Sequence, residues 1–227
     1  MNFYANVVTF FQTGGPFMYP IALVLVVGLI ITLERWAFLT SAKVTNKLAF
    51  DKMKTFIKER QFDNLYNVVR NSAAPVSNLV RAGLESIPVS RSRESLLCAM
   101  QESAYEILPR LEKRTSYLSV LANVATLLGL LGTIIGLIAA FTAVADADPA
   151  QKATLLSQSI SVAMNTTAFG LISAIPLLLF HALLQSKTAQ ITESLDIISV
   201  KFLNAFSAPE KLASHSQDVK VQVKDVA

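Results

Sequence analysis

Hydroxyl-bearing and small residues recur along two long uncharged runs, and these are the residues best placed to do chemistry. The runs cover 115–145 and 153–186, and neither contains Asp, Glu, Lys or Arg. A hydroxyl both donates and accepts a hydrogen bond, so such a row can join two apolar helices or line a polar path. The first row, at alternating steps of three and four, is Ser119, Ala122, Thr126, Gly129, Thr133, Gly136, Ala140 and Ala143, and a similar row is Ser159, Ala163, Thr166, Gly170 and Ser173, with Thr167 and Ala174 alongside.

Helix packing is the simplest explanation of both rows, because small residues let membrane helices approach closely and hydroxyls bond across the contact. Packing explains Thr133 and Thr167 less well, since bulky apolar residues flank both. A helix can also pack at its ends and line a cavity in its middle, so both roles stay open for these threonines. The residues to which we assign helix packing are Gly129, Gly132, Gly136 and Gly170.

The elements that carry these rows are long enough to cross a membrane. The first run has 31 residues, and at about 1.5 Å per residue its helix would be roughly 46 Å long, against a hydrocarbon core of ~30 Å. A third uncharged run, 16–33, ends at Glu34-Arg35. Hydrophobic residues make up 52% of the chain, too many for an ordinary soluble domain. We therefore expect an all-α integral membrane protein with three transmembrane helices, of which the second and third extend into the cytoplasm.

These considerations divide the chain into eight segments. We predict an interfacial amphipathic helix over 1–15, a first transmembrane helix over 16–39 and a cytoplasmic helical segment over 40–114. The second transmembrane helix covers 115–145, an outer loop 146–152 and the third transmembrane helix 153–186. Helical spacing continues over 187–206 as a cytoplasmic extension, and the polar tail 207–227 is expected to be disordered.

Basic residues are distributed unevenly, and this predicts the topology. Fourteen of the twenty Lys and Arg residues lie within 35–114, one lies in the loop after the second span, and five follow the third span. Cytoplasmic loops carry such an excess, so we expect a periplasmic N-terminus and a cytoplasmic C-terminus. Because topology explains the basic excess, we expect no nucleic-acid partner.

Several motifs resemble those of the MotA/TolQ/ExbB proton-channel family. The second span holds GLLGTIIGLI over 129–138, followed by Ala140-Phe141, and the third holds TTAFGLISAIP over 166–176. Glu34-Arg35 and the sequence APVSNLVRAGL over 74–84 fit the same pattern. Three spans with a large first cytoplasmic segment are similar to the ExbB/TolQ branch, not to the four-span MotA branch.

The resemblance implies a function and partners. Family members form homopentamers around a single-span partner of the ExbD/TolR type, whose intramembrane aspartate binds the ion. Ion flow driven by the proton-motive force rotates the two relative to each other, which does work in envelope transport, maintenance or motility. A TonB/TolA-like protein or a motility component would be a further partner. The resemblance thus implies a multi-pass, lipid-embedded protein of the bacterial inner membrane that needs no cofactor.

The resemblance also assigns the ion pathway, residue by residue. Thr133 and Thr167 match the threonines that line the path in the second and third spans, and Thr126, Asn165 and Thr166 add polar capacity nearby. Many ExbB/TolQ members have a proline where this chain has Thr126, and a glutamate where it has Val162. The first difference argues against a proline hinge in gating. The second removes a relay carboxylate, which leaves hydroxyls and water as the route.

Other classes of function fit the sequence less well. His181, His215 and Cys98 lie far apart and form no ligand or catalytic cluster, so we expect no enzyme activity and no metal. A secondary transporter would show inverted repeats and broken helices, and three spans offer neither. Two alternatives stay open: a sodium-driven member of the same superfamily, and a non-conducting membrane scaffold.

Overall fold

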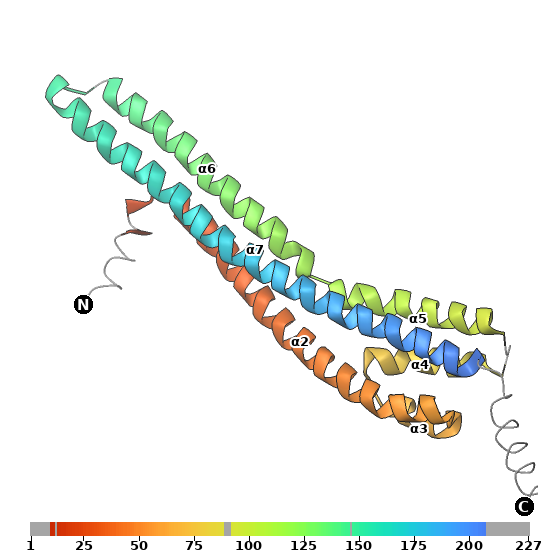
Figure 1. Cartoon of the computed structure of the whole chain (residues 1–227). Coiled ribbons are helices and arrows are strands. Elements are labelled where there is room, and N and C mark those ends of the chain that lie inside the picture. The colour runs from red at the N-terminus through yellow and green to blue at the C-terminus, as the bar shows by residue number, and fades with distance from the viewer. Residues whose placement is uncertain (1–9, 12, 89–91, 146, 208–227) are drawn as a thin grey trace, which may run out of the picture. The chain divides into compact units, whose positions relative to one another are not determined.

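A computed structural model describes residues 10, 11, 13–88, 92–145 and 147–207 of the chain, and helices dominate these ranges (Figure 1). The helices are α2 (Met18–Glu59), α3 (Phe62–Arg70), α4 (Pro75–Ser86), α5 (Arg93–Glu112), α6 (Thr115–Ala145) and α7 (Pro149–Ser207). The described residues contain no strand. The all-α prediction is therefore confirmed.

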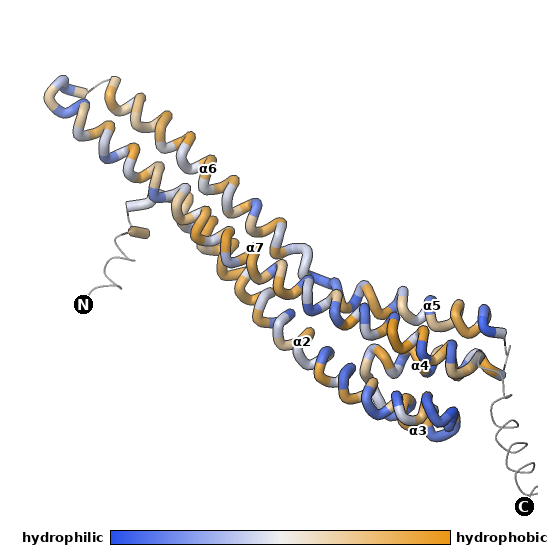
Figure 2. Tube along the Cα trace, in the orientation of Figure 1, coloured by the Kyte–Doolittle hydropathy of each residue, from blue (hydrophilic) through white to orange (hydrophobic). Residues whose placement is uncertain are grey.

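Three helical stretches are long and apolar enough to cross a membrane, as the sequence predicted. They are Met18–Glu59, Arg93–Ala145 and Pro149–Phe206. Figure 2 shows hydrophobic residues concentrated on α6 and on the earlier part of α2, with hydrophilic residues more frequent on α3. The exact membrane boundaries stay predictions.

The chain forms two compact units that share the continuous helices α2 and α7. The first, here called the apolar unit, comprises Met1–Thr40 and Glu112–Thr188; the second, here called the polar unit, comprises Ser41–Leu111 and Ala189–Ala227. The candidate site from the sequence lies wholly within the apolar unit.

In the apolar unit, close contacts join α7 to both other helices. A Cβ atom added at Gly28 of α2 would lie 2.5 Å from a methyl carbon of Leu177 on α7, and a Cβ added at Gly170 of α7 would lie 3.1 Å from Cα of Gly129 on α6. Lipid tails are as apolar as leucine, so such shape-dependent packing holds membrane helices together. α7 is therefore the helix against which the other two are positioned.

The polar unit has a core of the kind found in soluble helical proteins. Its largest fully buried side chains come from α2, α3, α4, α5 and α7, and they are Met53, Leu65, Leu79, Leu96, Met100, Leu111 and Phe202. Removing one such side chain from water contributes about 1.5–3 kcal/mol. Phe62 packs edge-on against Phe202 and Phe206, with ring centroids 6.2 Å apart in both pairs. This unit therefore depends on burial from water, unlike the apolar unit.

One predicted boundary differs from the structure, at the start of α7. The sequence predicted a loop over 146–152, but α7 already begins at Pro149, because proline is favoured in the first turn of a helix. The Asp148 carbonyl accepts hydrogen bonds from the backbone N–H groups of Gln151 and Lys152, at 2.9 and 3.2 Å. The predicted third span and its extension form one unbroken helix that contains Pro176.

The helices of the first two predicted spans differ in how they join the segment between them. α2 runs past the predicted end of the first span, residue 39, to Glu59 without a break. A short turn separates α5 from α6, at the start of the predicted second span. Arg114 lies there with φ of 65°, a left-handed conformation that ends a helix. The proline inside α5, Pro109, does not end that helix.

Two predicted segments fall largely on residues outside the described ranges. The interfacial helix over 1–15 is described only at residues 10, 11 and 13–15, and of the tail over 207–227 only residue 207 is described. Gly15 has φ of +76°, a conformation that glycine adopts without steric cost. This lets the chain turn into α2.

Candidate functional site

The site begins where α6 and α7 approach most closely, at Gly129 and Gly170. A Cβ at Gly170 would lie 2.8 Å from the carbonyl oxygen of Ala125, and a Cβ at Gly129 would lie 3.2 Å from Cα of Gly170. Both contacts are with backbone atoms, which cannot move aside as a flexible side chain can. Only glycine at these two positions permits this helix separation.

The other two glycines of α6 that were assigned to packing continue the same contact. A Cβ at Gly132 would collide with the Thr166 side chain, and a Cβ at Gly136 would lie 2.9 Å from Cβ of Ala163. The buried residues of α6 accordingly follow one face of the helix, and they are Thr115, Leu118, Ala122, Ala125, Gly129, Gly132 and Ala140. The threonines of the sequence row lie beside this face, not on it.

Thr133 and Thr167 meet at the edge of the α6–α7 contact. The two hydroxyl oxygens are in hydrogen-bond contact with each other, and both side chains are half-buried. The Thr167 hydroxyl donates to the Gly129 carbonyl at 2.9 Å. The Thr133 hydroxyl lies 3.2 Å from the same carbonyl and 3.4 Å from that of Ala163. Two residues 34 positions apart thus form one hydroxyl pair.

The hydroxyl pair can still accept hydrogen bonds from other groups. Each hydroxyl has one proton to donate and two lone pairs. When Thr167 donates to Gly129 and Thr133 donates to Thr167, both protons are used and the Thr133 oxygen still has lone pairs to offer. The pair can therefore accept a hydrogen bond from water, from a hydronium ion or from a protonated carboxyl group.

The other predicted pathway residues lie apart from this pair. Thr166 is fully buried, and its hydroxyl lies 2.6 Å from the Gly14 carbonyl, toward the turn that leads into α2. The Asn165 amide donates to the Thr13 hydroxyl at 3.5 Å. Thr126 is exposed on α6, and its hydroxyl donates to the Ala122 carbonyl one turn earlier at 3.1 Å.

Sequence reasoning missed the role of Thr166 in holding the N-terminal turn. Phe11 packs edge-on against Phe169 with ring centroids 4.9 Å apart, which places the same turn against α7. A signal was available, because adjacent helical residues point about 100° apart and the hydroxyls of Thr166 and Thr167 cannot both reach the same partner. The sequence did not indicate which of the two would meet Thr133.

Sequence reasoning also missed an ion pair between the ends of two spans. Arg114, just before α6, pairs with Glu34 of α2, and both side chains are about half exposed. The signal was that an acid closes one apolar run and a base precedes the next. Exposed pairs contribute ~0–1 kcal/mol, so this pair orients the helix ends more than it stabilises them.

Charged groups are absent from the neighbourhood of the threonine pair. The uncharged runs that form α6 and most of the predicted third span hold no Asp, Glu, Lys or Arg. Among the described residues no group of three or more His, Cys, Asp or Glu side chains could hold a metal ion. Of the chain's own groups, the hydroxyls of Thr133 and Thr167 are available for hydrogen bonding at the edge of the α6–α7 contact.

Comparison with known proteins places these features in a wider group. The sequence model of the MotA/TolQ/ExbB proton channel family matches residues 71–197. A relative from Methanothermobacter thermautotrophicus, named as a homologue of the biopolymer transport protein ExbB, is 27% identical over 203 residues, which cover 88% of this chain and 69% of the relative. A Synechocystis relative named ExbB-like 3 is 27% identical over 194 residues, which cover 79% of this chain and 90% of the relative.

Proposed function

The chain belongs to the MotA/TolQ/ExbB proton channel family, and we propose that it is the channel-forming subunit of an energy-transducing complex in the bacterial inner membrane. In this proposal it forms a homopentamer around a single-span ExbD/TolR-like partner. Proton flow between the two drives mechanical work for envelope transport, maintenance or motility. The observation that carries the proposal is the Thr133–Thr167 hydroxyl pair in a membrane-length helix contact without charged residues.

The chemistry of the pair supports a route for protons. A buried charge in a membrane is costly, and carboxylates found there generally serve a function. Here the partner supplies the carboxylate, and this chain supplies neutral hydroxyls whose spare lone pairs accept a hydrogen bond from its protonated form. The spare lone pairs of Thr133 accept from the protonated acid, while water in contact with the pair carries the proton onward. Because the side chains of this chain around the pair are uncharged, no nearby charge competes when the partner's carboxyl group gains or loses its proton.

Three of the predicted pathway residues take different places in this proposal. Thr126, exposed on α6, lies on the face that the partner would meet. Asn165 and Thr166 bond to the turn at Thr13 and Gly14, so we propose that they hold the entry to the first span. The hydroxyl pair itself remains the centre of the route.

One observation favours the scaffold alternative. The hydroxyls of Thr133 and Thr167 already lie near backbone carbonyls of their own chain, at 2.9 to 3.4 Å. A non-conducting protein could use the same bonds to join α6 to α7. The two functions differ in what happens when the hydroxyls are lost, because a packing role tolerates valine and a proton route does not.

The test is substitution of each threonine by valine, which keeps the shape and removes the hydroxyl. We expect proton flux in vesicles that hold both subunits to fall by about 5- to 150-fold for Thr133→Val and Thr167→Val. The lost hydrogen bond is worth about 1–3 kcal/mol, similar to the ~2.3 kcal/mol that one charge gains per 100 mV. Replacing the proton gradient by a sodium gradient in the same vesicles tests the sodium-driven alternative.

The matched control is Thr142→Val. Thr142 lies on the same helix and is exposed, and its hydroxyl donates only within the helix, to Ile138 at 3.0 Å. We expect normal flux for this variant. Normal flux in Thr133→Val and Thr167→Val together, with the partner still bound, would reduce the hydroxyl pair to helix packing, whereas an unmodified protein that conducts no protons would favour the scaffold.

A further inference from the structure

The polar unit carries opposite charges on two of its sides. Five lysines and two acidic residues lie within 41–59 on the later part of α2, whereas α4 and α5 together carry three arginines and five glutamates. Figure 1 shows α2 and α5 on opposite sides of this unit, with α4 and α7 between them. The unit is therefore basic along one side and acidic along the other.

The basic side is an ordered stripe on one face of α2. Lys43, Lys47, Lys54 and Lys58 are all exposed, and at about 100° per residue they fall within an arc of roughly 60°. The fifth lysine, Lys52, points to the other side of the helix by the same spacing. We call the four the lysine stripe.

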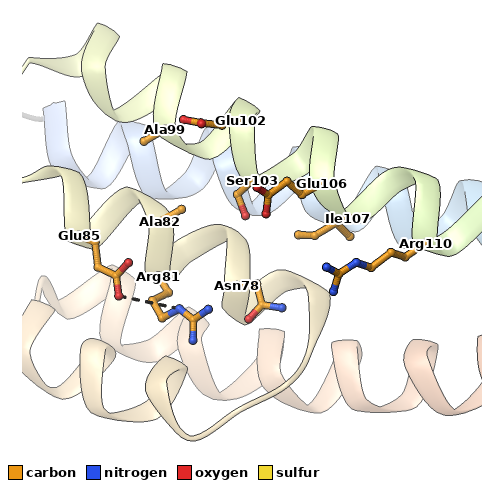
Figure 3. Close-up of a pocket in the computed structure, with 10 residues that line it drawn as sticks. All are labelled: Asn78, Arg81, Ala82, Glu85, Ala99, Glu102, Ser103, Glu106, Ile107 and Arg110. Atoms are coloured by element: carbon orange, nitrogen blue, oxygen red, sulfur yellow. Dashed lines mark ion pairs between the residues drawn. The ribbon is translucent and has the colours of Figure 1, made fainter.

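The acidic side contains a cleft between α4 and α5 of about 450 Å³, here called the acidic cleft. Figure 3 shows Ser103 and Glu106 of α5 pointing toward α4 across it. Arg81 is paired with Glu85 on its own helix at 3.9 Å. The α5 wall of the cleft carries Glu102, Glu106 and Arg110, so it has an excess of negative charge.

When a basic surface and a complementary acidic surface lie on different sides of one chain, copies of that chain can bind head to tail. Such contacts repeat from copy to copy and close into a ring when the rotation allows it. A self-complementary contact would place the same surface on both partners and would stop at a dimer. Opposite charges on opposite sides of the polar unit fit the first arrangement and not the second.

We propose that the lysine stripe of one copy docks against the acidic cleft of the next copy, with Lys54 and Lys58 near Glu102 and Glu106. This inference rests on the proposed homopentamer and names the surface by which its copies meet outside the membrane. Each ion pair is exposed and weak, but the contact recurs between every pair of neighbours. Charge complementarity of this kind sets the choice and orientation of partners more than their affinity.

Cross-linking tests the contact directly in membranes that contain the full chain. In a Cys98→Ser background, the pair Lys54→Cys and Glu106→Cys is treated with a short bismaleimide. We expect a ladder of covalent oligomers up to the size of the ring, because every copy offers both cysteines to different neighbours. The control Lys52→Cys with Glu106→Cys should give no ladder, since Lys52 lies on the other side of α2.

Several outcomes would overturn the inference. A ladder from the Lys52 control but not from Lys54, or a product that stops at the dimer, would exclude this contact. Native mass spectrometry distinguishes the absence of this contact from the absence of the pentamer on which the proposed function depends. A pentamer without the ladder removes only the contact, whereas a chain that stays monomeric or dimeric in gentle extraction contradicts the pentamer itself.

Charge exchange provides a second test that does not depend on cross-linker geometry. Glu102→Lys with Glu106→Lys should lower the pentamer-to-monomer ratio several-fold at low salt. Adding Lys54→Glu and Lys58→Glu should restore the ratio, because each neighbour then presents the opposite charge again. Failure of the exchanged variant to recover, while its helix content stays normal, would contradict the pairing.

Discussion

At the scale of single residues, the candidate site depends on two kinds of side chain. Gly129 and Gly170 bring the backbones of α6 and α7 together, and Thr133 and Thr167 meet at the edge of the contact that results. The glycines therefore determine whether the hydroxyls can reach each other. A change at the glycines should affect the site even though they carry no functional group.

This dependence predicts the effect of Gly170→Ala. The new methyl group would lie 2.8 Å from the Ala125 carbonyl oxygen and 3.1 Å from Cα of Gly129, so the helices must separate. Overpacking of this kind costs about 1–3 kcal/mol. We expect a lower melting temperature in detergent and reduced proton flux, measured on the same preparation.

The matched control for this prediction is Gly28→Ala on α2. Its nearest neighbours are the side-chain carbons of Leu177, which can rotate away, whereas backbone atoms cannot. We expect a smaller loss of stability and unchanged flux. Equal losses for the two variants would mean that backbone contact at Gly170 is not what positions the hydroxyl pair.

At the scale of elements, α2 contributes to the polar unit through a side chain that caps another helix. Ala74 at the start of α4 makes no side-chain cap. The buried Asn46 of α2 takes that place, because its Oδ1 accepts from the Val76 N–H at 2.8 Å. The Asn46 amide also donates to the Ser194 hydroxyl of α7. One residue therefore connects three helices.

Asn46→Ala should destabilise the polar unit by about 1–3 kcal/mol, because it leaves a buried N–H without an acceptor. Thermal unfolding followed by circular dichroism measures this loss. Asn46→Asp keeps the acceptor and should retain part of the stability. Asn64→Ala is the control, because Asn64 is exposed and its amide bonds only to Gln61. A control as unstable as Asn46→Ala would show that the cap is not the cause.

At the scale of the whole molecule, charge distribution and apolar length together predict how the chain crosses the membrane. The described chain has three stretches long enough to span, and the basic residues gather between the first and second of them. Positive charge is retained in the cytoplasm. The proposed orientation of the channel in the membrane depends on this topology.

Cysteine labelling in intact cells tests the orientation, in a Cys98→Ser background. We expect a membrane-impermeant thiol reagent to reach Asp148→Cys from outside. Lys52→Cys and Glu85→Cys should react only after the membrane is opened, because both lie in the segment predicted to be cytoplasmic. The opposite labelling pattern would reverse the proposed topology and with it the orientation of the proposed channel.

The sequence by itself determined the fold class and the family. Three uncharged runs of membrane length predict three spanning helices regardless of how they pack, because apolar length alone decides whether a helix can cross a bilayer. The motifs over 129–138 and 166–176 lie inside the matched family region, 71–197. The recurrence of small residues also predicted the face on which α6 could approach another helix, because small side chains let two helix backbones come close together.

Only the tertiary structure decided which hydroxyls come together. Thr166 and Thr167 are adjacent in sequence, yet one bonds to the turn at Gly14 and the other to Thr133 and Gly129. The rotation of α7 about its own axis makes this choice, and that rotation results from packing against α2 and α6 at once. No local pattern contains it, because each neighbouring helix is far away in the chain. The same holds for Asn46, whose capping of α4 depends on a contact between residues 30 positions apart.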